Sequence, residues 1–241
     1  MTNGFLFGGI ASWNFGMYVE RFPAQHASTR KKQTKSVAGR NGDLHLLQDA
    51  FSNYTQAYDC YFHGELPTPE TAHSIKAWLM ASGAYQRLED TYDPNHFRLA
   101  SFTGPLNIDN ILNKYGRCTV SFDCDPRSFL KSGERAVVFT SVGRIFNSTV
   151  FTALPIIKVY GTAAGTVTVG TATVTINEIT DPIILDCENQ NAYSQTGEGA
   201  PENKNSNIKA IPFPTLAPGE NVISFSGGIT KIEIIPRWWE L

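Results

Sequence analysis

The chain has 241 residues, 17% of them charged, and a formal net charge of −2. A chain this close to neutrality gives no electrostatic reason to expect duplex nucleic acid or an anionic membrane as its main partner. Hydrophobic residues make up 41% of the chain. That is enough apolar surface for a folded core, either in one large all-β domain or in two smaller domains.

Neither a signal peptide nor a membrane span is predicted. The N-terminal residues lack a basic leader followed by an apolar run, and no stretch approaches the roughly 18 apolar residues that a span requires. The cysteines Cys60, Cys118, Cys124 and Cys187 are scattered, with no histidine partner at metal-site spacing. We therefore expect reduced thiols in a protein made in a cytoplasm, with no membrane among its partners.

Short strands are predicted throughout the first part of the chain. Segments rich in aromatic and β-branched residues are separated there by Gly, Asn, Asp and Pro. The predicted strands lie at residues 5–10, 17–21, 44–47, 58–62, 97–102 and 117–124.

A basic run precedes a glycine-rich turn between the second and third of these strands. The run has no neighbouring aromatic residues, so a solvated hairpin or a contact between subunits is favoured over a nucleic-acid patch. In residues 38–44, Asn41-Gly42 predicts a type I′ hairpin turn, and no helix follows that would make the turn a phosphate site. The predicted subunit or partner interface comprises Arg30, Lys31, Lys32, Lys35, Arg40, Asn41, Gly42, Asp43, Trp238 and Trp239.

One α-helix is predicted, at about residues 68–83. Thr68 is a suitable N-cap, Pro69 suits the first helical position, and Gly83 is expected to end the helix. Apolar residues recur at three- and four-residue spacing, which indicates an amphipathic helix packed on a core. They are Ala72, Ile75, Trp78 and Leu79.

The second half of the chain predicts an antiparallel β-sandwich. Strand-like segments recur every 8–12 residues, and Thr and Val alternate on both sides of Gly170, which predicts a hairpin there. Residues 190–207 are polar and are expected to form a long surface loop. The predicted fold class is mostly β: an α+β domain with one helix at residues 1–135, and a β-sandwich domain at residues 136–241. A return of the last residues to the first domain is an open alternative.

No motif for catalysis, metal binding or cofactor binding emerges. The five histidines form no metal-ligand pattern, and no nucleophile elbow is present. The acidic pair Asp123 and Asp125 lacks the further oxygen ligands that a calcium loop needs. Nor does the sequence single out a pair of carboxylates at glycosidase spacing, so we expect no enzyme and no cofactor.

Aromatic residues in the second half raise a different alternative, a surface that binds host cell-wall carbohydrate. Sugar rings stack on flat aromatic faces, and Tyr193, Trp238 and Trp239 are the candidates. Adjacent residues of a strand point to opposite sides, so Trp238 and Trp239 cannot share one platform if that segment is extended. At least one of them is expected to close the core or a subunit interface.

Taken in order, several segments resemble the distal tail protein (Dit) family of long-tailed phages with flexible tails. Two departures are His96, at a position where an aromatic residue is common, and Cys124-Asp125-Pro126, where some members have Cys-Lys-Pro. The matching segments are residues 7–10, 37–44, 75–79, 85–88, 93–98, 147–149, 155–161, 184–188, 213–221 and 236–239.

The resemblance implies a structural virion protein rather than an enzyme. Family members form a homo-hexameric ring at the distal end of the phage tail, with the N-terminal domain around a channel through which DNA only passes and a galectin-like C-terminal domain outside. The ring joins the tail tube protein above to a tail-associated protein below, and it often anchors receptor-binding proteins. Assembly in the cytoplasm of a bacterial host is expected. Longer relatives carry inserted carbohydrate-binding modules, for which this chain has no room.

Overall fold

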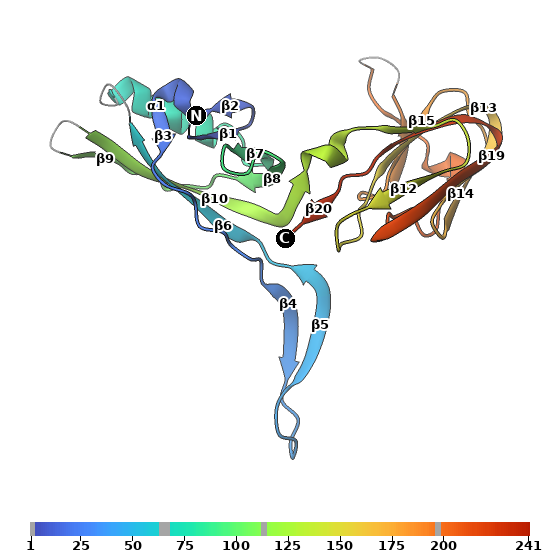
Figure 1. Cartoon of the computed structure of the whole chain (residues 1–241), viewed down its shortest axis with the longest axis horizontal. Coiled ribbons are helices and arrows are strands. Elements are labelled where there is room, and N and C mark those ends of the chain that lie inside the picture. The colour runs from blue at the N-terminus through green and yellow to red at the C-terminus, as the bar shows by residue number, and fades with distance from the viewer. Residues whose placement is uncertain (1–2, 63–67, 112–114, 196–198) are drawn as a thin grey trace. The chain divides into compact units, whose positions relative to one another are not determined.

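The computed structural model describes residues 3–62, 68–111, 115–195 and 199–241. By its internal contacts the chain divides into two compact units, residues 1–128 with Leu241 and residues 129–240. Most of the described residues lie in antiparallel strands, and α1 (Pro69–Met80) is the one α-helix in the described part of the chain (Figure 1). The mostly β fold predicted from the sequence is therefore confirmed.

The first unit is built on one antiparallel sheet in which neighbouring strands follow the order β2-β1-β7-β8-β10-β6-β3, with β9 also paired to β10 (Figure 1). Its strands are β1 (Phe5–Phe7), β2 (Ile10–Ala11), β3 (Met17–Val19), β6 (Tyr54–Phe62), β7 (Gln86–Asp90), β8 (His96–Ser101), β9 (Ile108–Ile111) and β10 (Tyr115–Leu130). A 3-10 turn, η1 (Ser12–Phe15), separates β2 from β3.

Aromatic rings fill the core of the first unit. The ring of Phe5 stacks on Tyr58 with centroids 4.9 Å apart, and Phe7 lies 4.8 Å from Phe122. Helix α1 contributes Trp78, whose indole N–H donates to the Phe7 carbonyl at 3.0 Å. This hydrogen bond satisfies the polar atom of the indole in an otherwise apolar site.

The predicted helix is confirmed, with a different end. The Thr68 hydroxyl accepts a hydrogen bond from the Thr71 N–H at 3.2 Å, as expected of an N-cap. Ile75, Trp78 and Leu79 are buried. The helix ends at Met80, before Gly83, and its C-cap Ala81 keeps a right-handed helical conformation. Gly83 is therefore not the glycine that ends the helix.

The basic run forms strand β4 (Arg30–Lys35), which pairs with β5 (Leu44–Phe51) in a separate two-stranded sheet (Figure 1). The predicted type I′ turn at Asn41-Gly42 is wrong. Lys35 pairs with Leu44, so the connection has eight residues, and a positive φ occurs at Gly42 but not at Asn41. The Arg40 N–H instead donates to the Val37 carbonyl at 3.2 Å across Gly39, whose φ is 78°.

The second unit is a separate antiparallel sheet with the strand order β11-β19-β13-β15-β16-β17, in which β12 also pairs with β19 and β14 joins β13 to β18. Its strands are β11 (Val137–Phe139), β12 (Gly143–Asn147), β13 (Ile156–Val169), β14 (Ala172–Ile176), β15 (Ile183–Asp186), β16 (Asn191–Ser194), β17 (Glu202–Asn203), β18 (Ile208–Lys209) and β19 (Gly219–Ile235). Two 3-10 turns, η2 (Lys131–Glu134) and η3 (Asn205–Asn207), complete it. The short strand β20 (Trp239–Glu240) lies outside this sheet.

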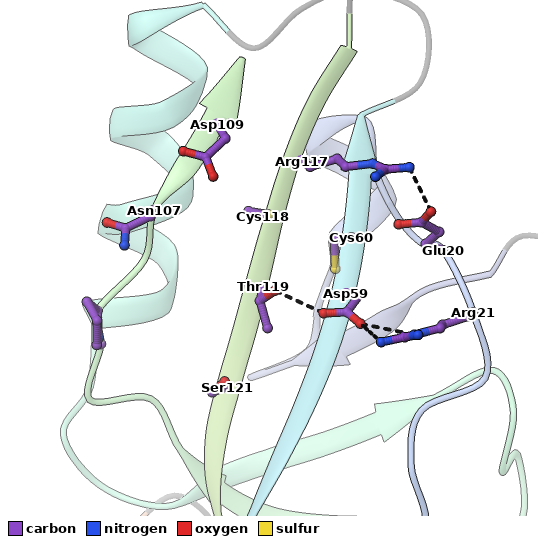
Figure 2. A pocket seen from close by; sticks show the side chains of 12 residues that line it. Glu20, Arg21, Asp59, Cys60, Asn107, Asp109, Arg117, Cys118, Thr119 and Ser121 are labelled. Carbon is purple, nitrogen blue, oxygen red and sulfur yellow. Dashed lines mark hydrogen bonds and ion pairs between the residues drawn. The ribbon is translucent and has the colours of Figure 1, made fainter. Parts of the chain in front are cut away.

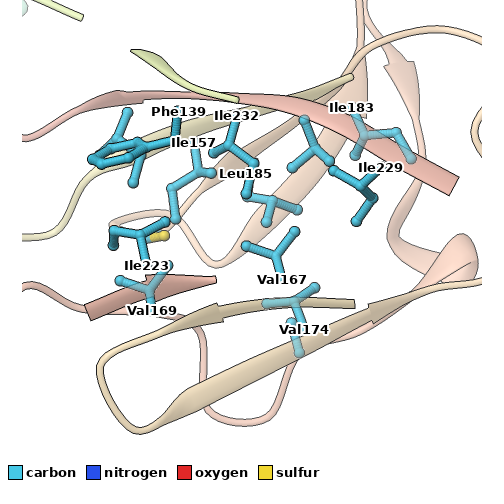
Figure 3. Close-up of a cluster of buried hydrophobic side chains, with 14 of the residues drawn as sticks. Phe139, Ile157, Val167, Val169, Val174, Ile183, Leu185, Ile223, Ile229 and Ile232 are labelled. Carbon is cyan, nitrogen blue, oxygen red and sulfur yellow. The ribbon is translucent and has the colours of Figure 1, made fainter. Parts of the chain in front are cut away.

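The long strands β13 and β19 form both layers of this unit because their pairing is irregular between Tyr160 and Gly165. At the irregularity Gly227 has a φ of 74°, and a Cβ there would lie 2.5 Å from the Ala164 carbonyl oxygen. Figure 3 shows the result: Val167 and Val174 face Leu185 across the apolar core. All three side chains are fully buried.

Two further sequence-based predictions have different outcomes. The hairpin at Gly170 is confirmed, since Val169 pairs with Ala172. Residues 190–207 are only partly loop: β16, β17 and η3 lie within them, and residues 196–198 are outside the described part. Strand β16 of this polar segment pairs with β15. This contact is non-local, so the composition of the segment does not reveal it.

Candidate assembly interface

The β4–β5 hairpin has the features of a segment that needs a partner. All six residues of β4 are exposed, so the described residues cover neither face of that strand. An isolated two-stranded hairpin is at best marginally stable in water. Its unpaired backbone groups also offer an edge to another chain. Residues 30–51 carry five Arg or Lys side chains against two Asp side chains, so a partner surface with negative charge would complement the hairpin.

The charged side chains of the hairpin are mostly free. Arg30 lies 4.6 Å above the Phe51 ring and 4.0 Å from the Asp49 carboxylate. Within the described part of the chain, no carboxylate forms an ion pair with Lys31, Lys32 or Lys35. Surface lysines are well solvated when unpaired, so these three remain available at little cost.

The two charges that flank the predicted turn do not pair with each other. Among the described residues neither Arg40 nor Asp43 takes part in an ion pair, and both lie in the exposed connection between β4 and β5 with Asn41 and Gly42. Arg40 and Asp43 are therefore not paired with each other in the described part of the chain, and pairing with a neighbouring subunit stays a prediction.

A polar cavity of about 670 Å³ lies in the first unit on the face of the sheet opposite the aromatic core. Along β6 and β10 the buried and exposed residues alternate, which directs Asp59 and Thr119 to this face while Cys60 and Cys118 turn toward the core. Figure 2 shows Asn107 and Asp109 on the opposite wall. The lining residues are Glu20, Arg21, Asp59, Cys60, Gly104, Pro105, Asn107, Asp109, Arg117, Cys118, Thr119 and Ser121.

Hydrogen bonds and ion pairs fix one wall of this cavity. Asp59 accepts from the Thr119 hydroxyl at 2.9 Å and from the Arg21 guanidinium at 2.6 Å (Figure 2). The Thr119 hydrogen bond, and then Arg21, hold the pKa of the Asp59 carboxyl below its usual value. Arg117 donates to Glu20 at 2.9 Å. Both guanidinium groups are therefore neutralised.

Asp109 is the carboxylate of this cavity with no ion-pair partner among the described residues. The lining holds three carboxylates and two guanidinium groups, so the cavity carries one net negative charge. Sequence reasoning missed this site because its lining comes from four separate segments, at residues 20–21, 59–60, 104–109 and 117–121. The strand alternation in β6 and β10 was the available signal for their exposed polar face.

The C-terminal tryptophans, which were assigned to the same predicted interface as the basic hairpin, pack within the second unit. Trp238 is buried in the core of the second unit, and the Leu130 N–H donates to its carbonyl at 2.9 Å. Trp239 stacks on Phe151 with ring centroids 4.2 Å apart, and its indole N–H donates to the Thr152 carbonyl. Both rings are occupied by contacts within the second unit.

Within the described residues, no group of three or more His, Cys, Asp or Glu side chains could hold a metal ion. The Nδ1 atom of His96 lies 2.6 Å from the Asp93 carboxylate, and this contact stabilises the turn between β7 and β8. All four cysteines are buried free thiols. No helix in the described part of the chain is long and apolar enough to cross a membrane.

The fold defines a class of protein: a mostly β chain of two units, one with a sheet, a helix and a projecting two-stranded hairpin, the other a bent antiparallel sheet. The same fold occurs in the crystal structure of the SPP1 Dit (gp 19.1) protein, described as a paradigm of the hub adsorption apparatus in phages that infect Gram-positive bacteria. The TM-score is 0.71 over 100% of both chains, with 10% sequence identity. No family model and no curated protein matches this sequence.

Proposed function

We propose that this chain is a structural, non-enzymatic component of a bacteriophage tail, a distal tail protein that forms a homo-hexameric hub ring. The ring joins the tail tube protein above to the baseplate or tail-tip proteins below, and it anchors tail-associated or receptor-binding proteins. Residues 1–135 build the ring, and residues 136–241 form the outer domain. The protein assembles in the host cytoplasm and resides at the distal end of the virion tail.

The fold shared with the SPP1 Dit protein supports a role in the tail hub. The observation in this chain that carries the proposal is the β4–β5 hairpin, whose strand β4 is exposed along its whole length. A closed ring of identical subunits buries the same two surfaces at every interface. The basic hairpin of one subunit and a negatively charged surface of the next satisfy that requirement.

The polar cavity of the first unit is the matching surface in this proposal. Its net charge is negative and Asp109 lacks an ion-pair partner among the described residues, so a lysine of the neighbouring hairpin would complete it. Charge complementarity of this kind fixes the register of an interface and suppresses wrong partners. Trp238 and Trp239 are assigned to the interface on sequence alone and remain a prediction.

Mass photometry of the purified full chain tests the ring directly. We expect particles of about six subunits, the ring size that the resemblance to distal tail proteins implies; a ring of identical subunits has closed point-group symmetry and therefore a defined mass. Replacing three lysines in Lys31→Glu/Lys32→Glu/Lys35→Glu should shift the mass distribution toward monomers. A wild-type chain that stays monomeric at micromolar concentration would overturn the proposal.

The control is Lys209→Glu, a charge reversal at an exposed position of β18 in the second unit. It should leave the particle mass unchanged. If the triple variant and the control dissociate equally, net charge rather than the hairpin governs assembly. Far-ultraviolet circular dichroism of each variant distinguishes dissociation from unfolding.

A further inference from the structure

A second candidate site lies on the outer face of the sheet in the second unit. Cross-strand pairing places one residue from each of five strands in a single row: Tyr193 opposite Ile184, Ile184 opposite Lys158, Lys158 opposite Glu233, and Glu233 opposite Val138. Directly opposite residues of antiparallel strands have their Cβ atoms about 5 Å apart. The row therefore brings an aromatic ring, an ammonium group and a carboxylate together.

A cavity of about 150 Å³ opens along this row. Its floor is apolar, because Ile156 pairs with Ile235 in the neighbouring row. The side chains that line it are Ala136, Ile156, Lys158, Ile184, Tyr193, Glu233 and Ile235. None of them belongs to the core cluster of the unit, which occupies the other face of the same strands.

Two hydrogen-bonding groups at this cavity have no partner within the described residues. They are the Lys158 ammonium and the Tyr193 hydroxyl. Lys158 lies 5.2 Å from the centre of the Tyr160 ring, a contact that leaves its N–H groups free. In the same part of the chain, no second aromatic ring stacks on Tyr193. The half-exposed Tyr193 therefore offers a ligand its hydroxyl group and a ring that no other aromatic ring covers.

The carboxylate of the site is held in place. Glu233 accepts from the Tyr160 hydroxyl at 2.9 Å and from the Lys231 ammonium at 2.8 Å. These groups, the Lys231 hydrogen bond first, hold the pKa of Glu233 below its usual value. A fixed, ionised carboxylate beside a free ammonium offers an acceptor and a donor at set positions, so a ligand meets little reorganisation cost.

We propose that this cavity binds one pyranose ring of a glycan, with the ring stacked on Tyr193. The apolar face of the sugar would lie on the tyrosine and the isoleucine floor, and its hydroxyl groups would reach the Lys158 ammonium and the Glu233 carboxylate. Ligand pockets for drug-sized molecules usually span about 300–1,000 Å³. A cavity of 150 Å³ is therefore sized for a single ring rather than a longer ligand.

The other aromatic residues considered for sugar binding are less suited to it. Trp238 is buried in the core and Trp239 is covered by Phe151. An aliphatic side chain of a protein partner could also fill an apolar cavity of this size. It would leave Lys158, Tyr193 and Glu233 without new hydrogen bonds, which favours a ligand rich in hydroxyl groups. This inference concerns the second unit alone and does not depend on ring formation.

Saturation-transfer-difference NMR on the full chain tests the site. The probes are methyl glucopyranoside, methyl galactopyranoside, methyl rhamnopyranoside and N-acetylglucosamine, with N-acetyl-leucinamide as the aliphatic comparison. We expect at least one sugar to receive saturation with a Kd on the order of millimolar, as befits a single ring. N-acetyl-leucinamide should receive none. Saturation of the leucine derivative without any sugar would overturn the proposal.

Substitutions at the cavity locate the binding. Tyr193→Ala should weaken it by about tenfold through loss of the stacking face, and Lys158→Met should weaken it while keeping the aliphatic stem. The matched control is Phe146→Ala, which removes a 68% exposed aromatic ring elsewhere in the same unit. If the Tyr193→Ala variant still binds the sugar with the same affinity, the sugar binds at another site. Tyr193→Phe, which keeps the ring, should retain most of the binding and serves if the alanine variant does not fold.

Mass photometry of Tyr193→Ala separates this inference from the proposed assembly. Its particle mass should equal that of the wild-type chain. Loss of sugar binding with an unchanged mass supports the cavity, whatever the oligomeric state is. If no probe sugar binds the wild-type chain, the saccharide proposal fails and the hub proposal is unaffected.

Discussion

Arg98 and Asp90 form a buried ion pair at the end of the β7–β8 hairpin. The Arg98 guanidinium lies 3.1 Å from the Asp90 carboxylate, and only 8% and 3% of their side chains are exposed. The same carboxylate accepts from the Tyr58 hydroxyl at 3.0 Å and from two backbone N–H groups of the following turn. Arg98 belongs to the segment 93–98 on which the resemblance to distal tail proteins partly rests.

Removing the cation from this pair should destabilise the first unit strongly. Arg98→Leu leaves the Asp90 carboxylate buried without its counter-charge, which typically costs about 3–5 kcal/mol. Urea unfolding followed by tryptophan fluorescence measures the loss, since Trp78 reports on this core. Arg144→Leu is the control, because it breaks an exposed pair with Glu220 that should be worth less than about 1 kcal/mol. Equal losses for the two variants would contradict a special role for the buried pair.

Alkaline conditions should destabilise the first unit through Tyr54. Burial raises the pKa of its phenol from 10.0 to about 12, partly offset by Arg98. A raised pKa means that the fold favours the protonated phenol. The stabilisation is complete below pH 10 and is lost as the pH rises toward 12. Between pH 10 and pH 12, the stability of the Tyr54→Phe variant should therefore fall less steeply with pH than that of the wild-type chain, as measured by circular dichroism. An identical pH dependence of the two proteins would refute the assignment.

The bend in the second unit should depend on Gly227. A methyl group there meets the Ala164 carbonyl oxygen at 2.5 Å, and the residue also has a φ of 74°. Gly219 has a φ of 88°, but the space that a methyl group would occupy there is open. Gly219→Ala should cost only the backbone term of about 1–2 kcal/mol. Gly227→Ala should cost clearly more in urea unfolding, because the strands β13 and β19 must also move apart. A smaller loss at Gly227 would show that the irregularity rearranges easily.

Elements that depend on neighbouring residues were predictable from the sequence. The α1 helix follows from the Thr68 cap and the spacing of Ile75, Trp78 and Leu79, all within a few turns. The Asn41-Gly42 turn was predicted from local chemistry and failed. The cross-strand pair Lys35 and Leu44 sets the length of that connection, and two residues of sequence do not determine the register in which two strands pair.

The candidate sites divide in the same way. The exposed basic strand could be predicted from its charges alone, because a run of lysines resists burial wherever the chain places it. The polar cavity of the first unit could not be predicted in this way. Glu20, Asp59 and Asp109 are far apart in sequence, and they line one cavity only because β6, β9 and the residue that follows β3 come together in the folded sheet.

By itself, the sequence determined that this chain is mostly β, that an amphipathic helix begins near Thr68, and that the basic run at residues 30–35 stays out of the core. Each of these depends on local spacing and composition. Only the tertiary structure decided that Arg98 pairs with Asp90, and that Tyr193, Lys158 and Glu233 line one cavity of the second unit. Strand register is chosen by the burial of a whole face at once, so no single segment carries the information that places these residues together.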